Sequence, residues 1–221
     1  MASVLVTGSN RGIGLEYCRQ LRDRGLEVIA VCRQPSAELQ ALGVRIESGL
    51  DQADSGMPAE LTDRLNGIPL DWVILNAGIL ESISFDQLDE DSIRRQFEVN
   101  ALAPLLLVRA LVGQIPNGGK LALMTSRMAS IDDNSSGGSY GYRMSKTALN
   151  SAGKSLAHDL RPRGIAVAIL HPGLVSTRMI GFNPRGISAE QAVKGLLCRI
   201  DALSLATSGT FWHANGEVLP W

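Results

Sequence analysis

The stretch that decides the fold is Ser3-Val-Leu-Val-Thr7-Gly8-Ser9-Asn10-Arg11-Gly12-Ile13-Gly14. An apolar run of strand length ends in a glycine-rich turn, and apolar residues at helical spacing follow it at Ile13, Tyr17 and Leu21. Glycine lets the backbone turn sharply and approach a ligand closely, and a helix N-terminus offers free N–H groups to an anion. The stretch therefore predicts a pyrophosphate-binding turn. The spacing of its glycines is G-x-x-x-G-x-G. The alternative is a turn whose glycines serve only the packing of the chain and bind no ligand.

The rest of the chain repeats this alternation of strand and helix. Further apolar runs of strand length, several of them apolar at successive positions, are Glu27 to Cys32, Val44 to Glu47, Leu70 to Asn76, Lys120 to Thr125 and Ile165 to His171. Such runs are typical of parallel strands that are covered on both faces. Helical spacing lies between them, notably in residues 89–111 and 139–160. We predict an α/β fold, a Rossmann-type doubly wound parallel sheet of about seven strands with helices on both faces, in a single domain spanning residues 1–221.

Composition excludes several classes of protein. A hydrophobic share of 45% and a charged share of 19% argue against disorder. The 21 basic residues are balanced by 22 acidic ones, so the protein has no overall positive field that could hold nucleic acid or an anionic membrane. The first residues lack a charged export signal, and the longest apolar run, residues 101–108, ends at Arg109. Cys18, Cys32 and Cys198 are far apart in the chain. We expect no metal site, and reduced, buried thiols in a cytoplasmic protein.

A second chemical feature is Tyr142-Arg-Met-Ser-Lys146, inside a helical pattern. A spacing of four places both side chains on one face of the helix, where an ammonium can lower the pKa of a phenol from about 10. Such a phenol can act as an acid near neutral pH. The alternative is an exposed tyrosine that rests on the stem of the lysine.

Residues 137–141, Gly-Gly-Ser-Tyr-Gly, also match the nucleophile elbow of serine hydrolases. An elbow needs a strand immediately before its serine, whereas a polar loop precedes Ser139. The hydrolase hypothesis is therefore disfavoured.

Together the motifs resemble the short-chain dehydrogenases/reductases. The marks of that family occur in order at Thr7 to Gly14 (T-G-x-x-x-G-x-G), Asn76 to Gly78 (N-A-G), Ser126, Tyr142 to Lys146 (Y-x-x-x-K) and Pro172-Gly173. The chain looks most like the C-factor-like carbonyl reductase branch, through residues 139–150, 171–173 and the tail 208–221. This resemblance implies an NADPH-dependent oxidoreductase that acts on a carbonyl or alcohol. The alternative is a signalling or regulatory dinucleotide-binding protein with slow or incidental turnover.

The resemblance also implies a catalytic tetrad. Tyr142 would exchange a proton with the substrate oxygen, and Ser126 would hydrogen-bond the same oxygen. Lys146 would hold the nicotinamide ribose and lower the pKa of Tyr142, and Asn100 would hold a water on the proton path.

Some of these assignments have rivals. Thr125 and Ser130 compete with Ser126, whose hydroxyl could also simply cap a turn. A helix Asn such as Asn100 is often satisfied by neighbouring backbone, and Asp51 could be an ordinary loop residue.

The residues that the resemblance assigns to NADP(H) are Gly8, Ser9, Asn10, Arg11, Gly12, Ile13, Gly14, Arg33, Asp51, Asn76, Ala77, Gly78, Tyr142, Lys146, Pro172, Gly173, Val175 and Thr177. NAD-specific relatives end the second strand with an acid, but Val31-Cys32-Arg33-Gln34 has no carboxylate. Arg33 and Arg11 could instead hold the 2'-phosphate, unless both are merely surface arginines.

The resemblance also implies a class of substrate and an oligomeric state. We expect a small-molecule aldehyde, ketone or quinone as substrate, and a homodimer formed through the helices that carry Asn100 and Tyr142. Only residues 174–187 separate Gly173 from the next helix, which predicts an open site that accepts many carbonyls and favours bulky aromatic ones. The alternative is that the loop Met128 to Gly138 covers the site.

Overall fold

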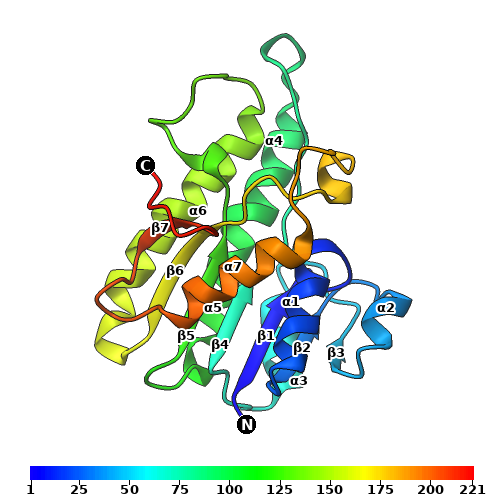
Figure 1. Ribbon diagram of the computed structural model, residues 1–221, viewed down its shortest axis with the longest axis vertical. Helices are drawn as coiled ribbons and strands as arrows, with labels where there is room; N and C mark the ends of the chain where they lie inside the picture. Colours follow the sequence, from blue (N-terminus) through cyan, green and yellow to red (C-terminus); the bar gives the residue numbers. More distant parts are fainter.

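The computed structural model describes residues 1–221 and contains one seven-stranded sheet between two layers of helices (Figure 1). The strands are β1 (Ser3–Thr7), β2 (Glu27–Val31), β3 (Arg45–Glu47), β4 (Trp72–Leu75), β5 (Lys120–Met124), β6 (Ala166–His171) and β7 (Thr210–His213). Their order across the sheet is β3-β2-β1-β4-β5-β6-β7, and every neighbouring pair is parallel. The predicted doubly wound parallel sheet is confirmed.

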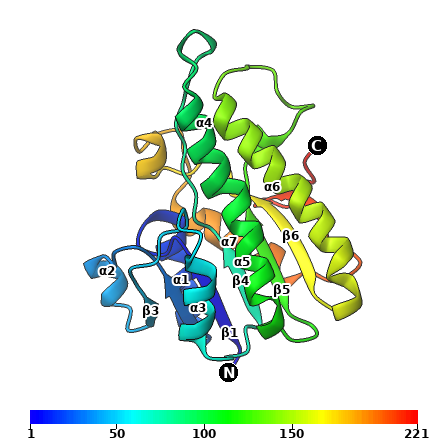
Figure 2. The ribbon, with the colours of Figure 1, turned by 180° about the vertical axis from the view of Figure 1, so that it is seen from behind.

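Helices cover both faces of this sheet. They are α1 (Gly12–Asp23), α2 (Ala37–Gln40), α3 (Met57–Leu65), α4 (Glu90–Phe97), α5 (Ala103–Leu111), α6 (Tyr140–Asp159) and α7 (Ala189–Asp201). One face is covered by α1 and α7, and the opposite face by α3, α5 and α6, as the two views in Figures 1 and 2 show. The short α2 lies at the β3 edge of the sheet.

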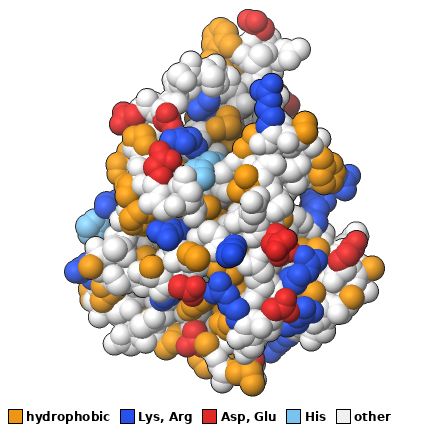
Figure 3. Space-filling view, in the orientation of Figure 1, with side chains coloured by type: hydrophobic (Ala, Val, Ile, Leu, Met, Phe, Trp, Pro, Cys, Tyr) orange, Lys and Arg blue, Asp and Glu red, His pale blue; other side chains and the backbone are white.

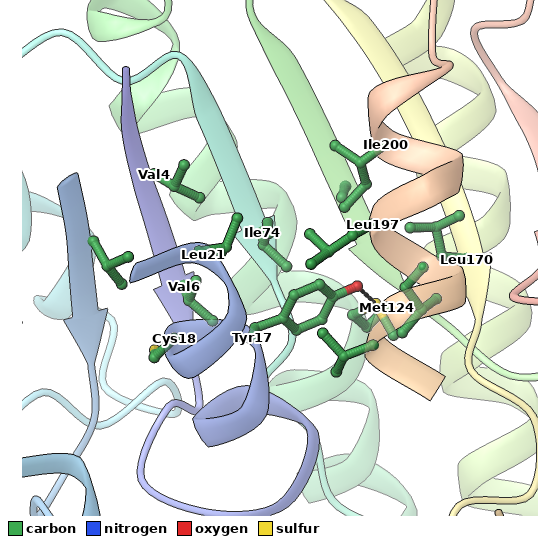
Figure 4. Close-up of a cluster of buried hydrophobic side chains, with 14 of the residues drawn as sticks. Val4, Val6, Tyr17, Cys18, Leu21, Ile74, Met124, Leu170, Leu197 and Ile200 are labelled. Atoms are coloured by element: carbon green, nitrogen blue, oxygen red, sulfur yellow. Dashed lines mark hydrogen bonds between the residues drawn. The ribbon is translucent and has the colours of Figure 1, made fainter. Parts of the chain in front are cut away.

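Burial on both faces explains why the strands are apolar at successive positions. Every residue of β1 is buried, with Val4 and Val6 in one core cluster and Leu5 in the other. Figure 4 shows the first cluster, in which Tyr17 and Leu21 of α1 meet the sheet. Each side chain of β1 therefore leaves water, and each buried leucine or valine contributes roughly 1.5 to 3 kcal/mol.

The helix predicted over residues 89–111 runs from Glu90 to Leu111 in the structure, but it is not α-helical along its whole length. A π-helical turn, Glu98–Leu102, separates α4 from α5 and contains the fully buried Asn100. The Asn100 amide binds both backbone polar atoms of Ile79: Nδ2 donates to the Ile79 carbonyl at 2.9 Å, and Oδ1 accepts from the Ile79 N–H at 2.9 Å. Nδ2 also donates to Ser145 Oγ at 3.0 Å. π-turns inside α-helices often mark functional positions, and this one carries a predicted site residue.

Glu90–Gln114 is long and apolar enough to cross a membrane by length and composition alone, with a mean hydropathy of 1.3 over its most apolar stretch. In the fold, Leu107, Val108 and Leu111 of this segment are buried in the cluster against the sheet. It therefore occupies the place of a core helix.

The expectation of three buried thiols is wrong for one cysteine. Cys18 and Cys32 are buried, and burial raises the pKa of Cys18 to about 12 and raises that of Cys32. Cys198 is exposed, because α7 turns its neighbours Leu197 and Ile200 into the core and leaves Cys198 on the solvent side.

On the outer surface, acidic and basic side chains are interspersed over the face in Figure 3.

Candidate active site

A cavity of about 810 Å³ opens at the carboxyl ends of the strands. Its walls come largely from the segments that follow strands β1 to β6. Strand order reverses between β1 and β4, which are neighbours in the sheet, and this is where ligands bind in open α/β sheets.

Most of the predicted site residues line this one cavity. They are Gly8, Asn10, Arg11, Gly12, Ile13, Gly14, Arg33, Asp51, Asn76, Ala77, Gly78, Tyr142, Lys146, Pro172 and Thr177. The predicted residues that are not on its wall are Ser9, Asn100, Ser126, Gly173 and Val175. Ser9 is fully buried, and its hydroxyl donates to the Val31 carbonyl at 3.0 Å.

Sequence reasoning did not assign several other lining residues to the site. Among them are Gln52, Ile79, Glu81, Arg95, Ser176 and Arg178. Several directly follow a recognised motif, as Ile79 follows Asn76-Ala-Gly78 and Arg178 follows Thr177. That adjacency is the one signal that could have identified them.

Glycine is required in the turn after β1 because other parts of the chain press against it. Gly8 has φ +66°, and a Cβ there would lie 2.8 Å from the Ala77 Cα. A Cβ at Gly14 would collide with the Gly8 carbonyl oxygen. α1 then begins at Gly12 with no side-chain cap and no acidic residue in its first turn. Its first N–H groups are therefore available to an anion.

Asn76-Ala-Gly78 fastens the end of β4 to this turn. Thr7 Oγ1 accepts from the N–H groups of Asn76 and Ala77, both at 3.1 Å. Asn76 Nδ2 donates to the carbonyls of Thr7 at 3.0 Å and Gly8 at 3.3 Å. The two motifs thus form one rigid wall, which lines the cavity on both sides of the β1–β4 junction.

Arg33, which follows β2, forms a loose ion pair with Asp51, which follows β3. Arg33 Nη1 lies 3.5 Å from Asp51 Oδ2, and the two side chains are 67% and 47% exposed. Asp51 Oδ1 accepts from the Ala53 N–H at 3.0 Å, which fixes that carboxylate. A pair this exposed contributes at most about 1 kcal/mol, so the guanidinium is free to turn toward an anionic ligand.

Tyr142 and Lys146 lie together on α6, as their spacing predicted. The Lys146 ammonium is 5.9 Å from the centre of the Tyr142 ring and donates to the Met124 carbonyl at 2.9 Å. Tyr142 is 8% exposed and Lys146 is 4% exposed, and both line the cavity.

Of the three candidate hydroxyls, only that of Ser126 acts on the Tyr142 phenol, whose pKa it lowers. Ser126 Oγ also accepts from the Met128 N–H at 3.2 Å, so it caps the turn after β5, as the alternative expected. Thr125 Oγ1 donates to the Lys146 carbonyl at 3.3 Å, and Ser130 Oγ donates to the Trp221 carbonyl at 3.0 Å. Thr125 lines the cavity and Ser126 does not, so it is the effect on the Tyr142 phenol that favours Ser126 over both rivals.

The expected lowering of the phenol pKa is not what the structure produces. Burial raises the pKa of Tyr142, and the hydrogen bond from Ser126 offsets only part of that rise. Burial also lowers the pKa of Lys146 to about 8. Tyr142 therefore keeps its proton at neutral pH, as a proton donor must, while the nearby Lys146 remains largely charged.

The loop Met128 to Gly138 does not cover the cavity. None of its residues lines the wall. The N–H groups of Ile131 and Asp132 donate to the Trp221 carbonyl at 2.7 and 3.0 Å, which holds the loop against the end of the chain. The structure therefore does not support the alternative in which this loop closes the site.

The segment after β6 carries a left-handed residue at the cavity. Phe182 has φ +54°, which for a residue other than glycine costs roughly 1–2 kcal/mol. Its ring is 65% exposed, and the neighbouring Met179 is 49% exposed.

Residues 2–185 match the family model described as short chain dehydrogenase. The chain belongs to the short-chain dehydrogenase family. Among its relatives is the 1-hydroxy-2-glutathionyl-2-methyl-3-butene dehydrogenase of Rhodococcus sp. (strain AD45), which is 42% identical over 226 residues and covers both chains completely. The C-signal protein of Myxococcus xanthus is 40% identical over 156 residues, which cover 69% of this chain and 93% of that protein.

Solved structures of family members share the whole fold. The NADPH-bound carbonyl reductase from chicken fatty liver superposes with a TM-score of 0.89 at 30% identity, covering 100% of this chain and 99% of that one. A carbonyl reductase of Pseudomonas aeruginosa PAO1 in complex with NADP gives a TM-score of 0.88 at 33% identity, with both chains fully covered. This short-chain dehydrogenase is therefore an oxidoreductase of Rossmann type.

Proposed function

We propose that this short-chain dehydrogenase is an NADPH-dependent oxidoreductase that interconverts a small carbonyl compound (aldehyde, ketone or quinone) and its alcohol. The observation that carries the proposal is one cavity that is lined by both the glycine turn and the Tyr142–Lys146 pair. Ser126 acts on the phenol of that pair by lowering its pKa. The NADP-bound carbonyl reductases of the same fold and the dehydrogenase relative support the same chemistry.

The residues present fit the cofactor. Gly8 and Gly14 leave a cradle that any Cβ would fill, the first turn of α1 is uncapped, and Arg33 has only a loose partner. The glycine turn and α1 would hold the pyrophosphate, and Arg33 with Arg11 the 2'-phosphate. When bound, NADPH supplies the hydride.

The proton is handled by the chain itself. Tyr142 donates its phenolic proton to the substrate oxygen in reduction and takes it back in oxidation. Ser126 donates a hydrogen bond to the same oxygen as negative charge develops there. Lys146, buried beside Tyr142, supplies positive charge that favours the phenolate left after transfer. Asn100 acts from behind the wall, where it holds Ile79 and Ser145 in place.

Turnover of a chemically varied set of carbonyls tests the proposal. Aldehydes, ketones, keto esters and quinones are each incubated with the protein and NADPH, and loss of absorbance at the nicotinamide band is followed. We expect reduction of several members of the set, with weak binding of the smallest. Tight binding of one small ketone with rejection of its homologues would contradict the open site.

The similarity to C-signal supports a second candidate, a signalling or regulatory role with incidental turnover. That role predicts NADPH binding without appreciable reduction of any carbonyl in the same set. Fluorescence titration with NADPH, run beside the turnover assay, separates the two functions.

Arg33 should determine the preference for NADPH over NADH. A charge-assisted hydrogen bond contributes about 1.5 to 3 kcal/mol, more than the exposed pair of Arg33 with Asp51 can oppose. We expect Arg33→Ala to weaken NADPH binding by about tenfold or more and to leave NADH binding nearly unchanged. The dissociation constants of both cofactors for both proteins measure this. Equal dissociation constants for NADPH and NADH in the unaltered protein would contradict the role of Arg33.

We also propose that the protein is a cytoplasmic homodimer that pairs through α4, α5 and α6. Large apolar side chains remain exposed on these helices and on the π-helical turn between α4 and α5: Phe97, Leu102, Leu105 and Met144 are 36–54% exposed. Sedimentation at micromolar concentration should give about twice the chain mass of 23.6 kDa. A mass of one chain would refute the dimer.

A further inference from the structure

The segment between β6 and α7 is fastened at its base by backbone hydrogen bonds. Val175 and Ile187 form a parallel bridge, in which the Ser176 N–H donates to the Ile187 carbonyl at 2.9 Å and the Ile187 N–H donates to the Leu174 carbonyl at 2.8 Å. Gly186 lies so close that a Cβ there would be 2.6 Å from the Ser176 nitrogen. The base cannot open without breaking these contacts, so the tip holds a fixed place at the cavity.

Backbone hydrogen bonds hold Phe182 in its left-handed conformation. The N–H groups of Ile180 and Phe182 both donate to the Thr177 carbonyl, at 3.1 and 2.9 Å, and the Gly181 N–H donates to the Arg178 carbonyl at 3.2 Å. The ring gains little from the fold in return, because it is 65% exposed. A bulky residue in an unfavourable backbone conformation, with its side chain unused by the core, points to a role outside the fold.

That ring lines the same cavity as Tyr142 and Lys146. Among the lining residues, Tyr142 and Phe182 are the aromatic side chains, and Tyr142 is buried, so Phe182 is the one exposed ring on the wall. Met179, one turn earlier on the same tip, adds a flexible thioether to that wall.

We propose that Phe182 is a specificity-determining residue, whose ring packs against the flat apolar body of a planar aromatic or quinonoid carbonyl substrate. This inference rests on the proposed function and names its substrate class. Aromatic faces attract other flat π-systems by offset stacking beyond simple burial, whereas a small aliphatic carbonyl reaches too little of the ring to gain from it. Met179 adjusts to the outline of the substrate beside the ring.

Two vicinal dicarbonyls of unlike size form the test: 9,10-phenanthrenequinone and 2,3-butanedione, which share the reacting group. Phe182→Asn removes the ring and keeps a residue that tolerates the left-handed backbone, and Phe182→Tyr restores an aromatic face. Phe85→Ala is the matched control, because Phe85 is 69% exposed and does not line the cavity. For each protein we measure kcat/KM with both substrates, the dissociation constant of phenanthrenequinone from the NADP⁺ complex, and Tm.

We expect Phe182→Asn to lower kcat/KM and the affinity for phenanthrenequinone about tenfold, and to change kcat/KM for butanedione less than about twofold. Phe182→Tyr and Phe85→Ala should resemble the unaltered protein, and NADPH affinity should not change. Equal losses on both substrates, or none, would overturn the inference. A fall of several degrees in the Tm of Phe182→Asn would also overturn it, since the ring would then serve the fold. If the unaltered protein turns over neither dicarbonyl, the proposed function fails, and the binding measurement still decides the role of Phe182.

Discussion

The Tyr142→Phe variant should lose reductase activity by about 1,000-fold while its affinity for NADPH stays the same. Only the phenolic oxygen is removed, and with it the proton that neutralises the substrate oxygen; general-acid catalysis of this kind accounts for roughly 10²- to 10⁴-fold in rate. The ring, its helix and the Lys146 ammonium all remain in place, since Lys146 is held by the Met124 carbonyl and not by the phenol oxygen. Steady-state turnover and NADPH titration of the same preparation measure the two effects separately.

Tyr140 provides the matched control for this experiment. It lies two residues away at the start of the same helix, is 36% exposed and does not line the cavity. Tyr140→Phe should therefore keep full activity. If Tyr142→Phe retained most of its activity, the proton would have to come from another group, and the assignment of Tyr142 would be wrong.

The Lys146→Met variant should lose activity and gain stability at neutral pH. Burial lowers the pKa of Lys146 to about 8 in the folded protein, against an ordinary value near 10.5 in the unfolded chain. Below pH 8 the folded protein carries the full cost of a buried ammonium, which methionine removes with a side chain of similar length. The hydrogen bond to the Met124 carbonyl is lost as well, so we expect a net gain in unfolding free energy of about 1 to 3 kcal/mol at pH 7.

The pH dependence of that gain identifies its cause. Between pH 8 and 10.5 the unfolded chain holds the Lys146 proton and the folded protein does not, so the stability of the unaltered protein rises with pH in this window. The advantage of Lys146→Met should therefore shrink from pH 7 to pH 10 in paired urea unfolding curves. A lower stability of the variant at pH 7, or a gap that widens with pH, would contradict the argument. The loss of activity, together with the gain in stability, would show that this lysine is kept for function.

The strands and the glycine turn could be predicted because few residue types can occupy them. β1 runs from Ser3 to Thr7 as its apolar run predicts, since a strand buried on both faces admits no charge. Gly8 and Gly14 are fixed by collisions with Ala77 and with the turn itself, so their pattern in the sequence reports the fold directly.

Two of the unpredicted features depend on contacts between distant segments, and a third depends on local contacts in a loop. The π-helical turn at Asn100 is stabilised by Ile79, which lies 21 residues earlier, and no local spacing in residues 89–111 indicates it. The pKa of Tyr142 depends on how deeply the packed helix buries the phenol, and a pattern of four residues says only that Lys146 is near. The left-handed backbone at Phe182 follows from hydrogen bonds to Thr177 within a loop that has no characteristic sequence.

The clasp between Thr7 and Asn76-Ala-Gly78 bears on how the protein folds. Its hydrogen bonds join residues 68 to 70 positions apart, and they exist only once β4 has docked beside β1. A connection of that length closes slowly, because the chain loses conformational entropy before the strand pairing and its hydrogen bonds can stabilise it. During refolding, α1 and the glycine turn can form early from local contacts, but the wall beside them is completed late. The nucleotide site is therefore among the last parts of this half of the molecule to mature, and a nascent chain released before residue 76 has the turn without the partner that shapes it.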